Sequence, residues 1–231
     1  MEEKQKILIE VKRLCAAYDG HPVLRDVNLT VRERDFLGVV GPNGGGKTTL
    51  VKCILGLLEP VEGEITCHPG PSSGAKLRMG YLPQYARIDR KFPITVAEVV
   101  LSGLAGSKSL VSPFTSAQRQ KAREVIRRMG LDGLERRPIG ALSGGQLQRT
   151  LLGRAVISDP EVLILDEPDA YLDRSSETRL YALLEELRRT CAVILVSHDA
   201  EAVRRLATTL VRVDGTASVM PARSPAASSP D

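Results

Sequence analysis

A glycine-rich segment has the residue types and spacing of a phosphate-binding loop. Residues 41–48 read Gly-Pro-Asn-Gly-Gly-Gly-Lys-Thr, with two glycines framing four residues before the lysine and threonine. A buried-strand pattern precedes the segment and a helical pattern follows it, so backbone N–H groups and the positive helix end should converge on a phosphate. Lys47 is expected to reach the β and γ oxygens, and the Thr48 hydroxyl to ligate Mg²⁺. The alternative is a glycine turn that only caps a helix, and the flanking patterns disfavour it.

Two carboxylates follow an apolar run later in the chain. Residues 162–165 are Val-Leu-Ile-Leu, and Asp166 and Glu167 come directly after them. In an open parallel sheet, ligands bind at the carboxyl ends of the strands. Asp166 is therefore expected to face the Mg²⁺ shell, usually through a water, and Glu167 to orient or deprotonate a water that attacks the γ-phosphate. Two acids after a strand can also cap a helix, but the phosphate loop upstream favours the catalytic interpretation.

The first part of the chain supplies strands and a helix to position the loop. Short β-prone runs at residues 7–14, 23–31 and 36–40 are separated by turn material. The third run is nearly all apolar, as in a strand of a mostly parallel sheet that is covered by helices on both faces. Residues 48–58 place apolar side chains at the spacing of a helix that buries one stripe.

The second part alternates helical and β patterns. From residue 93 to about 137 the segments are helical and charge-dotted, most clearly at 116–129, and we interpret them as a helical lobe inserted in an α/β core. The β pattern returns at 162–165 and 192–196. The helix expected between these two runs has one apolar face, formed by Leu180, Leu183, Leu184 and Leu187. Strand, helix, strand at this length predicts a parallel crossover.

A third motif indicates the family. Residues 142–146 read Leu-Ser-Gly-Gly-Gln, where a helix is expected to begin, ahead of the acidic pair. With it, the chain resembles the ATP-binding cassette (ABC) ATPases over about residues 7–215, because every family motif appears in the expected order. The motifs are Tyr18, residues 41–48, Gln84 within Tyr81-Leu82-Pro83-Gln84, residues 142–146, Asp166-Glu167, Leu172-Asp173 and His198 within Val196-Ser197-His198-Asp199.

The resemblance implies a fold and its boundaries. The fold is α/β, the P-loop NTPase fold of ABC ATPases, with a mostly parallel sheet core, an N-terminal antiparallel β subdomain and an inserted helical lobe. One ABC ATPase domain would span residues 1–215, with the lobe at about 93–157. Residues 216–231 are rich in Ala, Ser and Pro and are expected to be a disordered tail.

The resemblance also implies an ATP site shared by two copies of the chain. The candidate ATP-binding residues in one copy are Tyr18, Gly41, Pro42, Asn43, Gly44, Gly45, Gly46, Lys47, Thr48 and Thr49. The residues that would bind the γ-phosphate of ATP held by the other copy are Leu142, Ser143, Gly144, Gly145 and Gln146, at a second helix N-terminus. Tyr18 would stack on adenine or simply pack, and Thr49 would either approach the α-phosphate or pack.

The remaining family positions have roles in catalysis and dimer contact. His198 would touch the γ-phosphate and act with Glu167 in catalysis, and Asp173 would lie at the dimer seam. The implied Mg²⁺ residues are Thr48, Gln84 and Asp166, with Gln84 linking the ion and water to the helical lobe. Residues 168–172, Pro-Asp-Ala-Tyr-Leu, depart from the small residues usual in the family. This departure leaves open how the two copies communicate across the dimer seam.

Two segments indicate a branch of the family. Residues 43–46, Asn-Gly-Gly-Gly, and 89–96, Asp-Arg-Lys-Phe-Pro-Ile-Thr-Val, resemble the manganese and zinc importer ATPases. The resemblance implies the ATPase subunit of a divalent-metal importer, a homodimer that engages an integral membrane permease dimer and, indirectly, a substrate-binding protein. The alternatives are an iron-siderophore or cobalamin importer ATPase, a soluble ABC ATPase without a permease, and a switch module that does not hydrolyse ATP. Glu167 and His198 together disfavour the last.

Composition restricts the remaining classes. With 42% hydrophobic and 26% charged residues, the chain is neither fibrous nor disordered, and its four cysteines lack the spacing of a zinc site or disulfide framework. The net charge of +4 and 3% aromatic content argue against a nucleic-acid surface. The apolar runs are too short to cross a bilayer and the first residues lack a signal-peptide core, so we expect the chain to stay in the cytoplasm. The resemblance to importer ATPases implies a peripheral protein on the cytoplasmic face of the inner (plasma) membrane.

Overall fold

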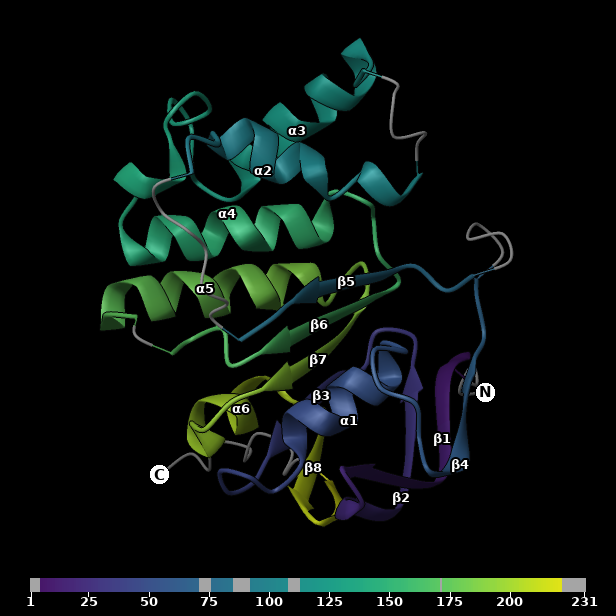
Figure 1. Ribbon diagram of the computed structural model, residues 1–231. Helices are drawn as coiled ribbons and strands as arrows, with labels where there is room; N and C mark the ends of the chain where they lie inside the picture. Colours follow the sequence, from purple (N-terminus) through teal and green to yellow (C-terminus); the bar gives the residue numbers. More distant parts are fainter. Residues whose placement is uncertain (1–4, 71–75, 85–91, 108–112, 171, 222–231) are drawn as a thin grey trace.

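The strands of the computed structural model form two sheets within residues 5–70, 76–84, 92–107, 113–170 and 172–221, the part of the chain that it describes (Figure 1). The small sheet has the antiparallel order β2-β1-β4, with β1 at Ile7–Tyr18, β2 at His21–Arg32 and β4 at Glu62–Cys67. The large sheet has the order β5-β6-β7-β3-β8-β9. Its strands are β3 (Phe36–Val40), β5 (Met79–Leu82), β6 (Val162–Asp166), β7 (Ala192–Val196), β8 (Thr209–Asp214) and β9 (Thr216–Pro221).

The large sheet is parallel apart from its last strand. β5, β6, β7, β3 and β8 pair in parallel, and β9 pairs antiparallel with β8. The predicted mostly parallel core and the N-terminal antiparallel subdomain are therefore confirmed. All the parallel strands end at one edge of the sheet, so the segments that follow them lie close together.

The helices lie on both faces of the large sheet. They are α1 (Lys47–Ile54), α2 (Val96–Ser102), α3 (Ser116–Arg128), α4 (Gly144–Val156), α5 (Arg174–Leu187) and α6 (Ala200–Leu206), with short 3₁₀ turns η1 (Ala105–Ser107) and η2 (Ile139–Ala141). In Figure 1, α2, α3 and α4 form a layer beyond α5, whereas α1 lies on the side of the small sheet. Within the described ranges, no helix is long and apolar enough to span a bilayer.

Alternating side chains of the central strands pack into two hydrophobic cores, one on each face of the large sheet. Leu163 and Leu165 of β6 pack with α4 and α5, and Val162 and Ile164 pack with α1 and the small sheet. This period of two on a strand whose residues are all buried explains the unbroken apolar run in the sequence. Of the four leucines expected on one face of α5, Leu180, Leu184 and Leu187 are buried and Leu183 is partly buried.

The helix after the phosphate loop is shorter than predicted. The apolar pattern predicts a helix over residues 48–58, but α1 ends at Ile54. Gly56 has a left-handed φ of 69° and its N–H donates to the Cys53 carbonyl, which terminates the helix. Leu55 and Leu58, the apolar residues beyond the end of α1, still pack on the core from the turn that follows the helix.

The disorder expected from Thr216 onward is wrong for residues 216–221. These residues form β9, which pairs with β8 through Val213 opposite Ala217 and Asp214 opposite Thr216. Gly215, with φ of 70°, makes the tight turn, and Ala217 packs on the core. The Asp214-Gly215 pair is a hairpin signal that the Ala, Ser and Pro composition obscured. Residues 222–231 lie outside the described part of the chain.

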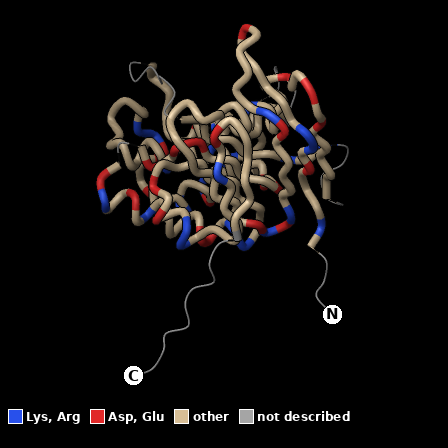
Figure 2. The backbone as a smooth tube through the Cα atoms, turned by 90° about the horizontal axis from the view of Figure 1, so that it is seen from below, with Lys and Arg blue, Asp and Glu red and all other residues tan. Residues whose placement is uncertain are grey.

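Charged side chains are spread over the molecule. Figure 2 shows Lys and Arg interspersed with Asp and Glu along the described chain. The four cysteines are free thiols, and the described residues contain no group of three or more His, Cys, Asp and Glu side chains placed to hold a metal.

Candidate functional site

Residues 41–46 form a tight loop between β3 and α1. Gly41 has φ of 150° and Gly46 has φ of 99°, and a Cβ atom would lie 2.0 Å from the Val213 carbonyl oxygen at the first and 2.5 Å from Leu24 Cδ2 at the second. Only glycine fits these two positions. The loop delivers Gly46 to the N-terminus of α1, where backbone N–H groups are left without intrahelical partners.

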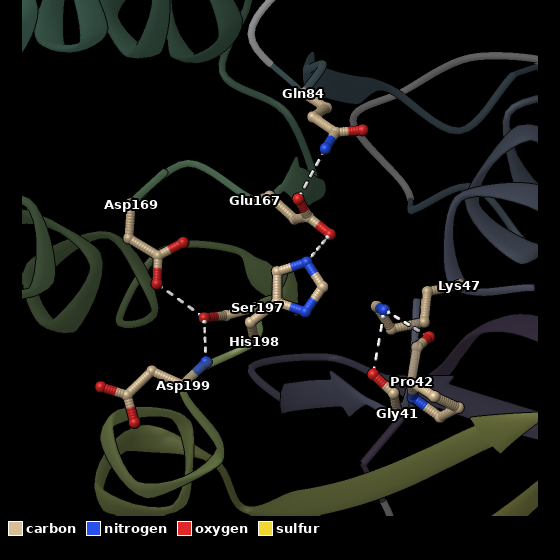
Figure 3. A network of polar contacts seen from close by, with 9 residues as sticks. All are labelled: Gly41, Pro42, Lys47, Gln84, Glu167, Asp169, Ser197, His198 and Asp199. Atoms are coloured by element: carbon tan, nitrogen blue, oxygen red, sulfur yellow. Dashed lines mark hydrogen bonds and ion pairs between the residues drawn. The ribbon is translucent and has the colours of Figure 1, made fainter. Parts of the chain in front are cut away.

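Lys47 is buried beneath this loop. Its ammonium donates to the carbonyl oxygens of Gly41 and Pro42, at 3.0 Å each (Figure 3). The side chain is thus held against the backbone that would surround a phosphate. Thr49, one residue after Thr48, is 6% exposed, which favours its packing role.

Asp166 is a fully buried carboxylate at the end of β6. It is 0% exposed, and no hydrogen bond of ordinary geometry reaches either carboxylate oxygen from the described residues. Burial raises the pKa of Asp166, and the nearby Thr48 hydroxyl and Lys47 ammonium offset part of that shift. A buried carboxylate without partners is costly, and a cation beside it removes the cost. One carboxylate and one hydroxyl suit Mg²⁺, which takes its other ligands from water and phosphate.

Glu167 lies between two polar side chains from neighbouring strand ends. Its carboxylate accepts a hydrogen bond from Gln84 Nε2 at 2.6 Å and contacts His198 Nε2 at 2.5 Å (Figure 3). Gln84 follows β5, Glu167 follows β6 and His198 follows β7, so three adjacent parallel strands deliver the three groups. The backbone at Glu167 has φ of 50°, and its N–H donates to the Val196 carbonyl at 2.9 Å. The side chain is therefore fixed at a strained backbone position.

The serine-led motif caps α4. Ser143 Oγ accepts from the Gln146 N–H at 3.2 Å, and the Gln146 side chain accepts from the Ser143 N–H at 3.0 Å, which is a capping box. Leu142 is buried, whereas Ser143 and Gly144 are exposed. A Cβ atom on Gly145 would lie 2.3 Å from Ser176 Oγ, so α4 begins directly against the first turn of α5.

Asp173 caps that neighbouring helix. Its carboxylate accepts from the Ser176 N–H at 2.9 Å and from the Ser175 hydroxyl at 2.7 Å, and these bonds lower its pKa to about 2. The motif that the resemblance assigns to ATP on another copy begins α4, and the residue that it places at the dimer seam caps α5, so the two are neighbours. The cluster of Lys47, Asp166, Glu167, Gln84 and His198 is built by other segments.

Tyr18 ends β1 on the surface beside α1. It is 40% exposed, and the Lys52 ammonium lies 3.4 Å from its hydroxyl and 5.6 Å from its ring centroid. A ring that remains partly exposed beside the helix after the loop is compatible with stacking on a base.

Sequence reasoning missed a second polar network beside the cluster of Gln84, Glu167 and His198. Asp169 Oδ2 accepts a hydrogen bond from Ser197 Oγ at 2.6 Å (Figure 3). It accepts another from the Tyr181 hydroxyl at 2.8 Å. The available signal was the departure of residues 168–172 from the usual family pattern. The partners of Asp169 come from distant parts of the sequence, so spacing alone could not identify them.

The comparisons with known proteins agree with this fold. The family model described as "ABC transporter" matches residues 24–170. A probable metal transport system ATP-binding protein of Chlamydia pneumoniae is 40% identical over 84% of this chain and 80% of its own. A zinc import ATP-binding protein of Hydrogenovibrio crunogenus is 37% identical, over 86% of this chain and 75% of its own. A manganese transport system ATP-binding protein of Bacillus subtilis is 36% identical, over 82% of this chain and 76% of its own.

Solved structures give the same result. The inward-facing conformation of a metal-chelate type ABC transporter superposes with a TM-score of 0.85 at 26% identity, covering 94% of this chain and 84% of that one. A dimeric bacterial ABC transporter cassette shares the fold with a TM-score of 0.79 at 24% identity, covering 94% of this chain and all of that one. The chain belongs to the ABC transporter family, and it is an ATP-binding and ATP-hydrolysing member of it.

Proposed function

We propose that this chain is the ATPase subunit of a transporter that imports a divalent metal ion of the zinc or manganese type. The observation that carries the ATPase assignment is the Glu167 carboxylate, held between Gln84 and His198 beside the Lys47 loop. The cargo is inferred from the relatives, several of which are named as zinc, manganese or metal transport ATP-binding proteins. These names favour metal import over siderophore or cobalamin import and over a soluble ATPase without a permease.

The phosphate loop binds the triphosphate of ATP in this proposal. The loop N–H groups and the start of α1 surround the β-phosphate, and Lys47 turns from the Gly41 and Pro42 carbonyls to the β and γ oxygens. Thr48, Asp166 and Gln84 would hold Mg²⁺, and the ion would supply positive charge to the phosphate oxygens when bound.

Glu167 then acts on the attacking water. The water oxygen forms a bond to the γ-phosphorus as the bond from that phosphorus to the bridging β–γ oxygen breaks, and the water proton passes to Glu167. ADP leaves with the bridging oxygen, and the new phosphate carries the water oxygen. For this step the contact between His198 and Glu167 opens, so that the imidazole donates to the γ-phosphate and the carboxylate faces the water.

The second half of the site comes from a partner copy of the chain. Ser143 and Gly144 are exposed at a capped helix N-terminus, which suits the γ-phosphate of ATP bound to another subunit. Asp173 lies at the neighbouring helix start and would contact the same seam. A solved cassette with the same fold is described as dimeric, and the head-to-tail arrangement of the two copies belongs to our proposal.

A membrane permease dimer is the proposed partner of the α2 and α3 layer, at the cytoplasmic face of the inner membrane, with a substrate-binding protein acting through that permease. Within the segment chosen from the sequence, residues 89–96, Phe92 is 60% exposed and residues 89–91 lie outside the described ranges. Copurification of a multi-span membrane protein with the tagged chain in detergent, from its native host, tests this partnership. Purification of the ATPase alone, under conditions that retain the permease in a known importer, would contradict it.

Replacing Glu167 with glutamine tests the catalytic assignment. Glu167→Gln keeps the shape of the side chain but removes the base, so kcat should fall about 10²- to 10⁴-fold while ATP affinity stays within about twofold. ATP turnover and binding by the purified protein measure both quantities. Hydrolysis at the parental rate by the Gln variant would remove Glu167 from the proposed role.

A further inference from the structure

Asp169 links three segments that meet at the catalytic cluster. Asp169 follows β6, and its Oδ2 atom accepts a hydrogen bond from Ser197, which directly follows β7 (Figure 3). The same atom accepts a second hydrogen bond from Tyr181 on α5. Ser197 is fully buried, and its hydroxyl also accepts the Asp199 N–H at 3.0 Å. The hydroxyl of Ser197 thus joins Asp169 to the backbone on the far side of His198.

This network runs beside the contact between Glu167 and His198. Glu167 and Asp169 are separated by one residue, and their partners His198 and Ser197 are adjacent. The carboxylates of one turn after β6 therefore bind two consecutive residues after β7. Glu167 lies 2.5 Å from the His198 ring nitrogen, and Asp169 lies 2.6 Å from the Ser197 hydroxyl. Hydrogen bonds to a carboxylate are about twice as strong as neutral ones, so the second contact is substantial.

Tyr181 anchors the acceptor. Burial raises the pKa of the Tyr181 hydroxyl, and the Asp169 carboxylate raises it further, so the hydroxyl stays protonated and remains a donor at neutral pH. Asp199 fixes the other end, because its carboxylate accepts the N–H groups of Glu201 and Ala202 and caps α6. His198 is therefore held between two fixed points, whatever its own ring contacts.

We propose that Asp169 is a positioning residue for ATP hydrolysis, which holds the segment at His198 in register with Glu167 through the Ser197 hydroxyl. This inference rests on the proposed ATPase mechanism, in which the ring of His198 must leave Glu167 to reach the γ-phosphate. Because the Asp169 contact does not involve that ring, it persists when the Glu167 contact opens. The imidazole then turns from a fixed backbone position.

Kinetics of an Asp169→Ala variant test the proposal. The kcat for ATP should fall about tenfold while KM stays within about twofold, because the phosphate loop still binds ATP and only the geometry of the reacting groups is lost. Asp169→Asn keeps an acceptor oxygen at the same reach and should restore kcat to within about threefold of the parent. The matched control is Thr178→Val on α5, which deletes a hydroxyl that donates, among the described residues, to the Arg174 carbonyl, and this variant should leave kcat unchanged.

Histidine-ring NMR provides a readout that loss of stability alone does not move. The chain has three histidines, His21, His68 and His198, so a His198→Ala sample assigns the third ring signal. In Asp169→Ala the His198 signal should shift or broaden while the other two stay in place. This measurement needs no turnover, so it still tests the link if the proposed ATPase mechanism fails. Tyr181→Phe, which removes one donor only, should move the signal in the same direction and replaces the alanine variant if that variant does not fold.

Three results would overturn the proposal. One is an unchanged His198 signal in a folded Asp169→Ala protein. Another is movement of all three histidine signals, which would mean a general structural change. The third is an equal rise in KM and fall in kcat. Loss of turnover in Glu167→Gln together with any of these would reject only the role of Asp169, whereas retained turnover in Glu167→Gln would reject the catalytic assignment itself.

Discussion

The two halves of the proposed ATP site are held in different ways. In the half at the ends of the parallel strands, the polar groups bond to one another. Lys47 bonds to its own loop, and Glu167 is held by Gln84 and His198. The half at the starts of α4 and α5 has its hydrogen bonds satisfied within each helix cap, yet it presents Ser143 and Gly144 to the surface.

This difference indicates which half has to change when ATP binds. In the proposed mechanism, charged groups of the strand-end half exchange their present partners for phosphate, so ATP binding should open several contacts there. The helix-tip half keeps its capping bonds and offers remaining N–H groups to a phosphate on another copy. Strand-end substitutions should therefore act within one chain, and helix-tip substitutions only across the dimer.

Removing Lys47 should give the largest effect on ATP binding. Lys47→Ala deletes the ammonium that would bind the β and γ oxygens, and loss of such a charged contact weakens affinity by about 100-fold or more. Isothermal titration of ATP into the purified protein measures it. The control is Lys52→Ala on the same helix, whose ammonium contacts Tyr18 and should weaken binding by less than about tenfold. Equal losses of ATP affinity in the two variants would refute the proposed contact of Lys47 with the phosphates.

Mixing two inactive variants should separate the halves. Ser143→Arg places a bulky cation at the exposed helix tip, which should lower kcat about 100-fold in the homodimer while each chain still binds ATP. A mixed dimer of Lys47→Ala and Ser143→Arg chains has one composite site with both residues intact, so ATPase activity should return on mixing. The rates of the mixture and of each variant alone are compared at equal total concentration. Activity no higher than the sum of the separate variants would contradict a site shared between copies.

Much of this site was predictable from local sequence because each of its elements has a recognisable pattern within a few consecutive residues. The apolar runs before Gly41, Asp166 and Ser197 predict buried parallel strands, and such strands necessarily bring their following residues to one edge. Gly41 and Gly46 match the loop pattern because their backbone angles and crowding exclude any side chain.

What the sequence concealed depends on contacts between distant residues. Tyr181 and Ser197 meet Asp169 only after β6, α5 and β7 pack, and no spacing rule connects them. Residues 216–221 were assigned to a tail by composition, although a turn glycine and pairing with β8 order them. The end of α1 likewise depends on the backbone angle of Gly56, which the apolar pattern of the following residues masked.

The smallest expected effect is a change in the free energy of unfolding caused by Asp166. The sign of this change with pH distinguishes the buried Asp166 carboxylate from the surface groups of the helix-tip half. Burial raises the pKa of Asp166, so the folded chain disfavours the charged form more than the unfolded chain does. Without Mg²⁺, stability should therefore be lost as the pH rises from the ordinary value of 3.8 through the raised pKa of the folded state. Asp166→Asn removes this penalty and should raise the free energy of unfolding by about 1–3 kcal/mol at pH 7, with little difference below pH 3.8.

Urea unfolding at several pH values, with and without Mg²⁺ and ATP, measures this stability difference. The surface variant Asp132→Asn, whose carboxylate is 64% exposed, should leave stability within about 0.5 kcal/mol of the parent. Addition of Mg²⁺ and ATP should stabilise the parent more than Asp166→Asn, because the parental carboxylate then gains a cation and the amide gains none. An Asn variant less stable than the parent in Mg²⁺-free buffer at pH 7 would mean that Asp166 has partners within the chain, and the argument for a metal ligand at the end of β6 would fail.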